Sequence, residues 1–141
     1  MDDILAGQMQ KWSYAMKKIQ LSDAEWKIMD RLWEMPDLTI RQLTEELNEE
    51  TGWDKHTIIT LLGRIEKKGA VSYRQNGRAK EFYPIVSRQA VSREETKSFL
   101  EKVYKGSLSL MVHSMVEDQS LSQEEIGKLY QILKESERKR K

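Results

Sequence analysis

Cysteine is absent from the 141 residues of this chain, and proline occurs only twice. The lack of cysteine excludes disulfide bonds and metal sites built from thiolates, and it agrees with a reducing compartment. No apolar run approaches the roughly 18 residues of a membrane-spanning helix, and the N-terminal residues do not follow the pattern of a signal peptide. We therefore expect a cytoplasmic protein without membrane insertion.

The groupings of side chains that support catalysis are also missing. The chain has no nucleophile beside a base, no carboxylates clustered with histidine and no glycine-rich phosphate loop. Its two histidines, His56 and His113, have no further ligands at the spacing that metal sites show. We therefore expect no enzymatic activity, no cofactor and no metal, and binding is the class of function that remains.

Charge is distributed unevenly along the chain, although the net charge is only +1. Residues 21–53 contain three basic and nine acidic side chains, which is a local net charge of −6. Residues 54–88 contain eight basic and three acidic side chains, which is a local net charge of +5. Affinity for nucleic acid depends on the phosphates that a local surface neutralises, so this pattern indicates nucleic-acid binding by residues 54–88.

The segment from Asp54 to Gly69 has the pattern of a helix with one buried face. Its apolar residues recur at the spacing i, i+3, i+4, i+7. Asp54 can cap the start of this helix, and Gly69 can adopt the left-handed conformation after its end. The other positions carry mostly cationic and hydroxyl groups, which suits a face that lies against DNA. The apolar stripe consists of Ile58, Leu61, Leu62 and Ile65.

Two short strands are predicted directly after this helix, at residues 70–75 and 81–86. Asn76 and Gly77 form a tight-turn signal between the strands, and Arg78 and Lys80 lie near the tip. A cationic helix followed by a hairpin with a basic tip is typical of a winged helix-turn-helix protein. In such proteins the helix enters the major groove and the wing lies along the phosphates.

Two more helices are predicted before the cationic helix, as a helix-turn-helix core requires. Ser22 and Glu25 have the spacing of a capping box, and the helix that they open stops before Pro36. Thr39 and Gln42 have the same spacing and open the second helix. The order of three helices and a hairpin therefore predicts a winged helix.

The candidate DNA contacts follow from this prediction. They lie on the cationic helix, away from its apolar stripe, and near the tip of the hairpin. One alternative is that these are ordinary solvated side chains. Another is that the winged helix serves as a protein–protein interaction module, which the acidic residues 21–53 would suit. The candidate contacts are Lys55, His56, Thr57, Ile59, Thr60, Arg64, Arg78 and Lys80.

The C-terminal part of the chain has two further helical patterns. Ser92 with Glu95, and Ser122 with Glu125, have capping-box spacing, which predicts one helix over residues 93–116 and another near the C-terminus. Their apolar positions are too many for the two helices to bury against each other, so we expect a homodimer. The candidate dimerisation residues are Phe99, Val103, Tyr104, Met111, Met115, Ile126, Leu129 and Leu133.

These elements predict a fold that is mainly α with a small β-hairpin. We assign residues 21–91 to a winged helix DNA-binding domain and residues 92–141 to a helical dimerisation region with a basic tail. Residues 1–20 form an N-terminal extension, in which apolar residues recur from Leu5 to Ile19 at alternating steps of four and three. Either a helix with one apolar stripe or a frayed terminus agrees with that pattern.

With these residues identified, the chain resembles the penicillinase-repressor family, the BlaI/MecI/CopY group of bacterial transcriptional regulators. The resemblance runs in unbroken order from about Leu21 to Leu133, and it leaves out residues 1–20 and the basic tail. The matching pieces include Leu21-Ser22-Asp23-Ala24-Glu25-Trp26, Leu32-Trp33, Gly52-Trp53, Thr57-Ile58, Lys67-Lys68-Gly69, Gly77-Arg78-Ala79, Tyr83-Pro84 and Val103-Tyr104-Lys105-Gly106-Ser107.

The resemblance implies a homodimer that binds an inverted-repeat operator near a promoter and blocks transcription. In the members that control antibiotic resistance, a membrane sensor of β-lactams leads to cleavage of the dimerisation helix before a phenylalanine. The corresponding bond here is Ser98–Phe99, although those members carry asparagine before the phenylalanine. A sensor or protease is therefore an implied partner. Copper-responsive members use a cysteine motif that this chain lacks.

Two residues of the cationic helix depart from the family pattern. Ile59 stands where many members have arginine, and Gly63 stands where asparagine or threonine is common. Both positions lie on the face that is predicted to contact DNA. We therefore expect an operator sequence that differs from the family's usual one.

Overall fold

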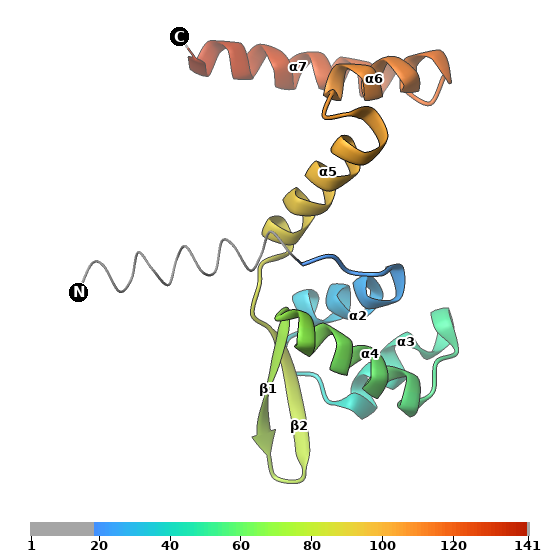
Figure 1. Cartoon of the computed structure of the whole chain (residues 1–141), viewed down its shortest axis with the longest axis vertical. Helices are drawn as coiled ribbons and strands as arrows, with labels where there is room; N and C mark the ends of the chain where they lie inside the picture. Colours follow the sequence, from blue (N-terminus) through green and yellow to red (C-terminus); the bar gives the residue numbers. More distant parts are fainter. Residues whose placement is uncertain (1–18, 141) are drawn as a thin grey trace, which may run out of the picture. The chain divides into compact units, whose positions relative to one another are not determined.

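The computed structural model of the chain describes residues 19–140. In this range three helices precede a β-hairpin and three follow it, which confirms the predicted fold class (Figure 1). Most of the apolar pattern that begins at Leu5 lies outside the described residues. The elements are α2 (Asp23–Glu34), α3 (Ile40–Thr51), α4 (Lys55–Lys68), β1 (Val71–Asn76), β2 (Ala79–Pro84), α5 (Arg88–Tyr104), α6 (Leu108–Glu117) and α7 (Gln123–Arg140).

The chain divides into two compact units, with the boundary between Thr96 and Lys97. We refer to residues 19–96 as the N-terminal unit and to residues 97–140 as the C-terminal unit. The N-terminal unit contains α2, α3, α4, the hairpin and the first half of α5. The C-terminal unit contains the end of α5 together with α6 and α7.

Both predicted capping boxes at the start of the N-terminal unit are confirmed. The Ser22 hydroxyl accepts a hydrogen bond from the Glu25 amide, and the Glu25 carboxylate accepts one from the Ser22 amide. Thr39 and Gln42 exchange the same pair of bonds at the start of α3. These bonds satisfy amide groups that have no partner within the helix, and they explain why the two helices begin where they do.

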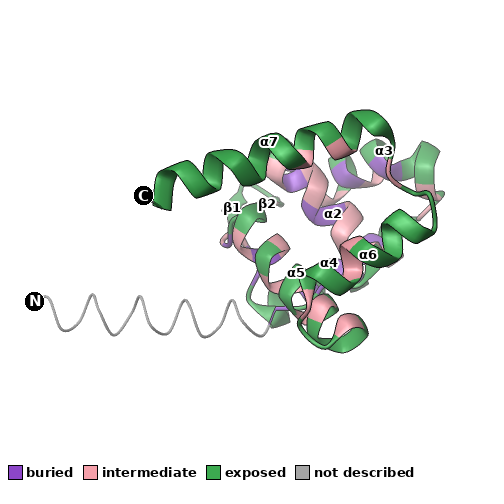
Figure 2. Ribbon diagram, turned by 90° about the horizontal axis from the view of Figure 1, so that it is seen from above, coloured by how far each residue is buried: buried purple, intermediate pink, exposed green. Residues whose placement is uncertain are grey.

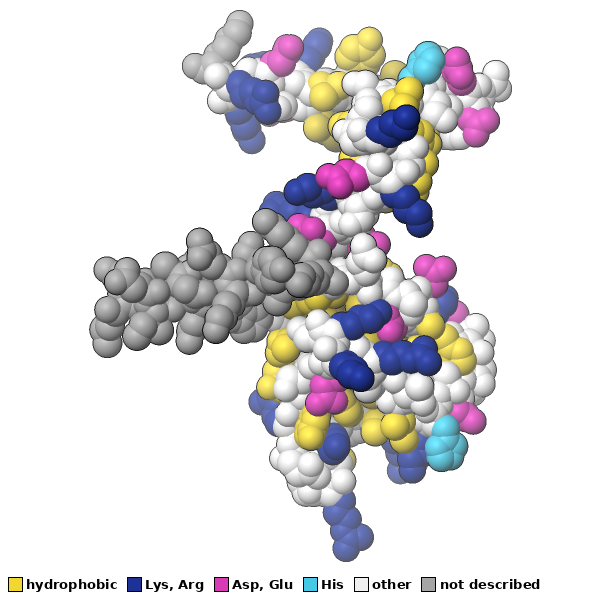
Figure 3. Space-filling view, in the orientation of Figure 1, with side chains coloured by type: hydrophobic (Ala, Val, Ile, Leu, Met, Phe, Trp, Pro, Cys, Tyr) yellow, Lys and Arg dark blue, Asp and Glu magenta, His cyan; other side chains and the backbone are white. Residues whose placement is uncertain are grey.

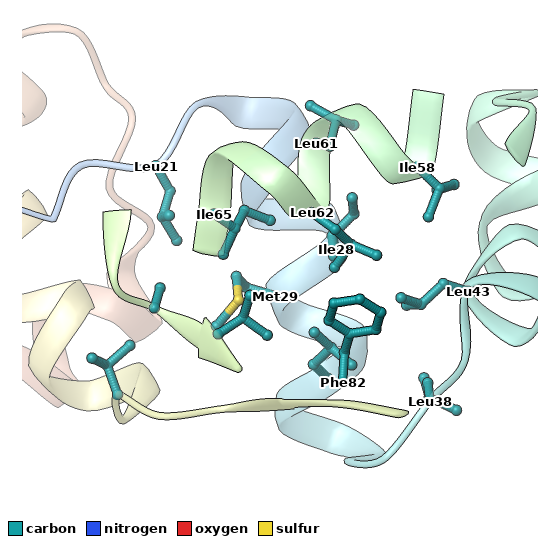
Figure 4. Close-up of a cluster of buried hydrophobic side chains, with 14 of the residues drawn as sticks. Leu21, Ile28, Met29, Leu38, Leu43, Ile58, Leu61, Leu62, Ile65 and Phe82 are labelled. Carbon is teal, nitrogen blue, oxygen red and sulfur yellow. The ribbon is translucent and has the colours of Figure 1, made fainter. Parts of the chain in front are cut away.

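The hydrophobic core of the N-terminal unit lies between α2, α3, α4 and the hairpin (Figure 4). Helix α4 contributes the four residues of its predicted apolar stripe, and Phe82 contributes an aromatic ring from β2. The buried apolar residues are Ile19, Leu21, Ile28, Met29, Leu32, Leu38, Leu43, Leu47, Ile58, Leu61, Leu62, Ile65, Ala70, Val71, Phe82, Val86 and Val91.

Three tryptophans pack against this core. Trp26 and Trp33 are in ring contact, with centroids 5.6 Å apart. The Trp33 indole nitrogen donates a hydrogen bond of 2.9 Å to the carbonyl of Val86, which anchors the chain after the hairpin. Trp53 is half-buried against the same cluster. The tryptophans therefore support the core and the backbone.

The hairpin is antiparallel, and its register places Asn76 opposite Ala79. Gly77 and Arg78 form the loop, so the predicted turn at Asn76–Gly77 was displaced by one residue. Gly77 has φ of 64°, which glycine adopts without strain and which suits the first position of a two-residue hairpin loop. A single bridge between Leu38 and Phe82 attaches the hairpin to the connection between α2 and α3.

The start of α5 differs from the prediction. The helix begins at Arg88, and the Ser87 hydroxyl accepts a hydrogen bond from the Ala90 amide. The predicted capping box at Ser92 is therefore wrong, because the helix has already begun four residues before Ser92. The Glu95 carboxylate instead accepts a hydrogen bond of 3.1 Å from the amide of Leu21. A distant partner has replaced the local one.

The predicted helix over residues 93–116 is also wrong, because the structure contains two helices there. The break lies at Lys105 and Gly106, which have left-handed φ angles of 52° and 84°. The Gly106 amide donates to the Leu100 carbonyl, and the Ser107 hydroxyl accepts from the Leu110 amide to cap α6. Gly106 therefore ends α5, and the Ser107 that follows it caps the start of α6.

Glu25 is the one buried charged residue of the described chain, with 2% of its surface exposed. Burial raises the pKa of its carboxyl, but hydrogen bonds from Lys68 and Ser22 outweigh that effect and hold the pKa below its usual range. The Lys68 ammonium lies 2.5 Å from the Glu25 carboxylate and also donates to the carbonyl of Gln20. This contact joins the end of α4 to the start of α2.

We expect Glu25→Gln to lower the free energy of unfolding at neutral pH by about 1–2 kcal/mol, because the variant loses the charge that strengthens these hydrogen bonds. Since the folded-state pKa is depressed, the contribution of Glu25 is complete above about pH 4.3 and is lost as the pH falls through the folded-state value. Chemical denaturation between pH 7 and pH 3 measures the difference.

The exposed Glu49 provides the matched control, because Glu49→Gln removes a carboxylate from the surface of α3. We expect that variant to unfold within about 0.5 kcal/mol of the wild type at each pH. A stability difference between the wild type and Glu25→Gln that stays constant down to pH 3 would contradict this account of Glu25.

Candidate nucleic-acid interface

The ends of α4 are set by residues that the sequence predicts. The Asp54 carboxylate accepts hydrogen bonds from the Thr57 amide, at 2.9 Å, and from the Thr57 hydroxyl, at 3.0 Å. These two bonds hold the pKa of Asp54 below its usual range. Gly69 ends the helix with φ of 85° and donates its amide to the carbonyl of Glu66. The helix is therefore defined by side chains next to it in sequence.

The apolar stripe of α4 is buried in the N-terminal unit, as its spacing predicts. This burial turns the opposite face of the helix to the outside. Thr57 is only half-exposed, and its hydroxyl proton is held by Asp54. The other candidate contacts on this helix are exposed, namely Lys55, His56, Ile59, Thr60 and Arg64. Burial of one face therefore leaves five of the six candidates accessible.

Two residues in the middle of this face differ in character from its charged ends. Ile59 is 41% exposed, although the other apolar side chains of α4 are buried. Gly63 is exposed, and a Cβ atom added to it would meet nothing within 4 Å apart from the adjacent residues and the backbone of its own helix. Glycine in a helix interior costs about 0.5–1 kcal/mol relative to alanine. Neither internal packing nor a left-handed φ angle explains that cost here.

The hairpin presents its own cationic groups. Arg78 occupies the loop and is exposed, and Figure 3 shows a basic side chain at the end of the hairpin. The Lys80 ammonium lies 4.3 Å from the centroid of the Tyr73 ring. Such a contact holds the charge of a lysine near the strand without neutralising it. Both candidate residues of the wing are therefore accessible to an anion.

Arg74 is a wing residue that the sequence analysis did not select. Its guanidinium lies 4.8 Å from the centroid of the Tyr83 ring and 3.1 Å from the Asp37 carboxylate. Asp37 belongs to the connection between α2 and α3, so Arg74 links the hairpin to the helical core. The only sequence signal for such a role is the adjacency of aromatic and basic residues along both strands.

Lys67 is a second accessible cation outside the candidate set, on the turn of α4 that follows Arg64. Two acidic residues near this surface have partners: Asp54 caps the helix, and the Glu81 carboxylate accepts a hydrogen bond from the Asn76 side-chain amide. Glu66 is an exposed carboxylate on α4 beside these cations. A helix face and a hairpin tip that carry cations can neutralise a row of phosphates. No cluster of metal-binding side chains occurs within residues 19–140.

The C-terminal unit exposes apolar side chains that the single chain leaves uncovered. Figure 2 shows that α7 is exposed along most of its length. Among the candidate dimerisation residues Tyr104, Met111, Ile126 and Leu129 are half-buried. The other four, which are Phe99, Val103, Met115 and Leu133, are exposed. Further exposed apolar residues that the sequence analysis did not select are Leu108, Leu110, Val116, Tyr130 and Ile132.

The bond between Ser98 and Phe99 lies within α5, two residues after the boundary between the units. The Phe99 ring is half-exposed and contacts the Tyr104 ring, with centroids 6.0 Å apart. None of the helices in the described part of the chain combines the length and the hydropathy that a membrane crossing needs.

Comparison with known proteins gives consistent matches. The family profile described as penicillinase repressor matches residues 21–135. The penicillinase repressor of Bacillus licheniformis is 37% identical over 127 residues, which cover 89% of this chain and 99% of that protein. The methicillin resistance regulatory protein MecI of Mammaliicoccus sciuri is 32% identical over 117 residues, which cover 83% of this chain and 95% of that protein.

A solved structure with a similar sequence is the solution structure of the DNA-binding domain of the repressor BlaI. It is 31% identical to this chain, with a TM-score of 0.47. The alignment covers 50% of this chain and 87% of that domain.

Proposed function

The chain belongs to the penicillinase repressor family, and on that premise we propose that it is a transcriptional repressor that binds double-stranded operator DNA as a homodimer. The observation that carries this proposal is the exposed face of α4, which lies opposite a buried apolar stripe and is followed by a hairpin with a basic tip. The protein acts without enzymatic activity, and bound protein blocks the promoter.

The roles of the candidate residues follow from their positions. Lys55, His56, Thr60 and Arg64 contact base edges and nearby phosphates in the major groove. Arg78 and Lys80 bind phosphates or the minor groove beside it. The Thr57 hydroxyl donates its proton to the Asp54 carboxylate that caps α4, so that this hydroxyl can only accept a hydrogen bond from DNA.

The homodimer accounts for the exposed apolar residues of the C-terminal unit. A two-fold axis presents one α4 from each protomer, and the operator is then an inverted repeat whose half-sites lie one or two helical turns apart. Each protomer's N-terminal unit binds one half-site. Because a bacterial repressor works on DNA in the cytoplasm, we place the protein there.

Release by proteolysis is a second element of the proposal. The Ser98–Phe99 bond lies just after the N-terminal unit, so hydrolysis would leave that unit with Val91 and Glu95 in place. The same cut would remove α6, α7 and the exposed apolar residues that form the dimer. Two unlinked N-terminal units then bind the operator more weakly than one dimer does. A protease must first unwind this turn of α5.

The competing function is a protein–protein interaction module that uses the acidic face of α3. Three of the four glutamates of α3 form ion pairs with neighbours, namely Glu45 with Arg41, Glu46 with Arg31 and Glu50 with Lys27. Operator binding predicts a strong loss of affinity with salt, by about 10³–10⁵ between 50 and 200 mM for 6–10 phosphate contacts. A protein–protein interaction module would have no specific affinity for operator DNA, so this loss of operator affinity with salt would not be observed.

We expect Arg64→Ala and Arg78→Ala to weaken binding to the DNA upstream of the protein's own gene without unfolding the protein. A base contact contributes about 1–3 kcal/mol, and each lost phosphate contact lowers the salt slope by about one. Titration of labelled DNA at two salt concentrations measures both quantities. Lys128→Ala removes an exposed lysine of α7 and serves as the control. Unchanged affinity in both arginine variants would refute the assigned geometry.

We expect Leu133→Glu to convert the dimer into a monomer, because Leu133 is 64% exposed in the single chain and a charge there opposes burial at an interface. Sedimentation at micromolar concentration distinguishes the two states. The neighbouring variant Lys134→Glu changes charge at an exposed position and should remain dimeric. If both variants sediment as dimers, the interface does not include this part of α7.

We expect cells that receive a β-lactam to contain an N-terminal fragment that ends at Ser98. Mass spectrometry of the repressor from induced and uninduced cells identifies that end, and transcription of the controlled gene should rise as the fragment accumulates. Induced transcription from cells in which the repressor stays intact would exclude proteolytic release. Operator binding itself would stand in that case.

A further inference from the structure

The middle of the exposed face of α4 lacks free hydrogen-bond donors, in contrast to its two ends. Lys55 and His56 lie at one end, and Arg64 and Lys67 lie toward the other. Between them the Thr60 hydroxyl donates its proton to the carbonyl of His56, at 3.0 Å. Thr60 can therefore offer a base only acceptor lone pairs or a methyl group.

Ile59 and Gly63 occupy the same middle section. They are four residues apart, so they are neighbours on one side of the helix. Ile59 places a branched apolar side chain toward the outside, where it is 41% exposed. Gly63 leaves bare backbone beside it, and apart from adjacent residues and the helix's own backbone nothing lies within 4 Å of where a Cβ would be. The middle section therefore presents an apolar side chain at position 59 and no side chain at position 63.

The fold does not account for either residue. A polar side chain at position 59 would be better solvated, and alanine at position 63 would favour the helix. Gly63 lowers the stability of the helix, and Ile59 offers an apolar surface beside it, on the face that the proposed function turns toward DNA. In a major groove, the apolar group that base edges present is the C5 methyl group of thymine.

We propose that the middle of α4 reads a thymine methyl group in each operator half-site, with Ile59 packed against the methyl and the bare backbone at Gly63 allowing the helix to approach the base edges. This inference rests on the proposed operator binding. It makes Ile59 a specificity-determining residue, and Gly63 a residue that permits close approach. The preference is for thymine over every base that lacks the methyl.

The first experiment replaces each thymine of the operator in turn with deoxyuridine, which removes only the methyl group. For the full-length protein we expect the substitution at one thymine per half-site to lower affinity by about four-fold for each methyl group. The loss should be equal at 50 and 200 mM salt, because no charge is involved. Thymines outside the half-sites should show no effect.

Ile59→Ala and Ile59→Val assign that effect to the side chain. With Ile59→Ala we expect thymine and deoxyuridine operators to bind equally, whereas Ile59→Val should keep part of the difference. Ile59 is exposed, so neither variant disturbs the core. The inference is overturned if no thymine substitution lowers affinity, or if the loss is as large in Ile59→Ala as in the wild type.

Gly63→Ala tests the close approach. We expect its unfolding midpoint to rise and its operator affinity to fall about ten-fold or more, since an added methyl group must be accommodated in a packed interface. Asn48→Ala, at an exposed position of α3, also improves helix propensity and should leave affinity unchanged. Wild-type affinity in Gly63→Ala would overturn the close approach.

The two levels of the proposal fail differently. A wild-type protein that protects no operator DNA would contradict the proposed function. Normal operator binding that is insensitive to every methyl group would contradict only this inference.

Discussion

The burial of the apolar stripe of α4 is the constraint on which the N-terminal unit depends. Ile58, Leu62 and Ile65 are almost fully covered by α2, α3 and the hairpin. A rotation of the helix about its axis would move charged residues into the core, at a cost that the small unit cannot absorb. The cationic face is therefore turned outward by the packing of the opposite face, and residues that stabilise the fold differ from those available for DNA.

Contacts between distant residues hold this helix and the hairpin as one preorganised surface. Arg74 ties the hairpin to Asp37, and Lys68 ties the end of α4 to Glu25. Trp33 anchors the chain that leaves the hairpin. Preorganisation reduces the cost of ordering the surface when DNA binds. The C-terminal unit contrasts with this arrangement, because many of its apolar residues remain exposed in the single chain.

The success of sequence-based prediction depended on the range of the interactions involved. The capping boxes at Ser22 and Thr39 and the apolar stripe of α4 were predicted correctly, because each depends on residues within four positions of one another. The start of α5 was wrong because Ser87 and Ser92 are both acceptable caps, and Glu95 finds its partner in Leu21. The hairpin loop was displaced by one residue because glycine is acceptable at either position of a two-residue loop, so that both Asn76–Gly77 and Gly77–Arg78 are possible loops.

The periodicity, the caps and the separation of acidic from basic residues are visible in the amino-acid sequence, and the fold class and the helix face that can meet DNA follow from them. These are properties of neighbouring residues, so they can be read without a structure. Tertiary contacts establish three further facts: Glu25 is buried, Arg74 links the wing to the helical core, and no internal contact requires glycine at position 63. Those facts depend on which distant groups packing brings together, and periodicity carries no information about them.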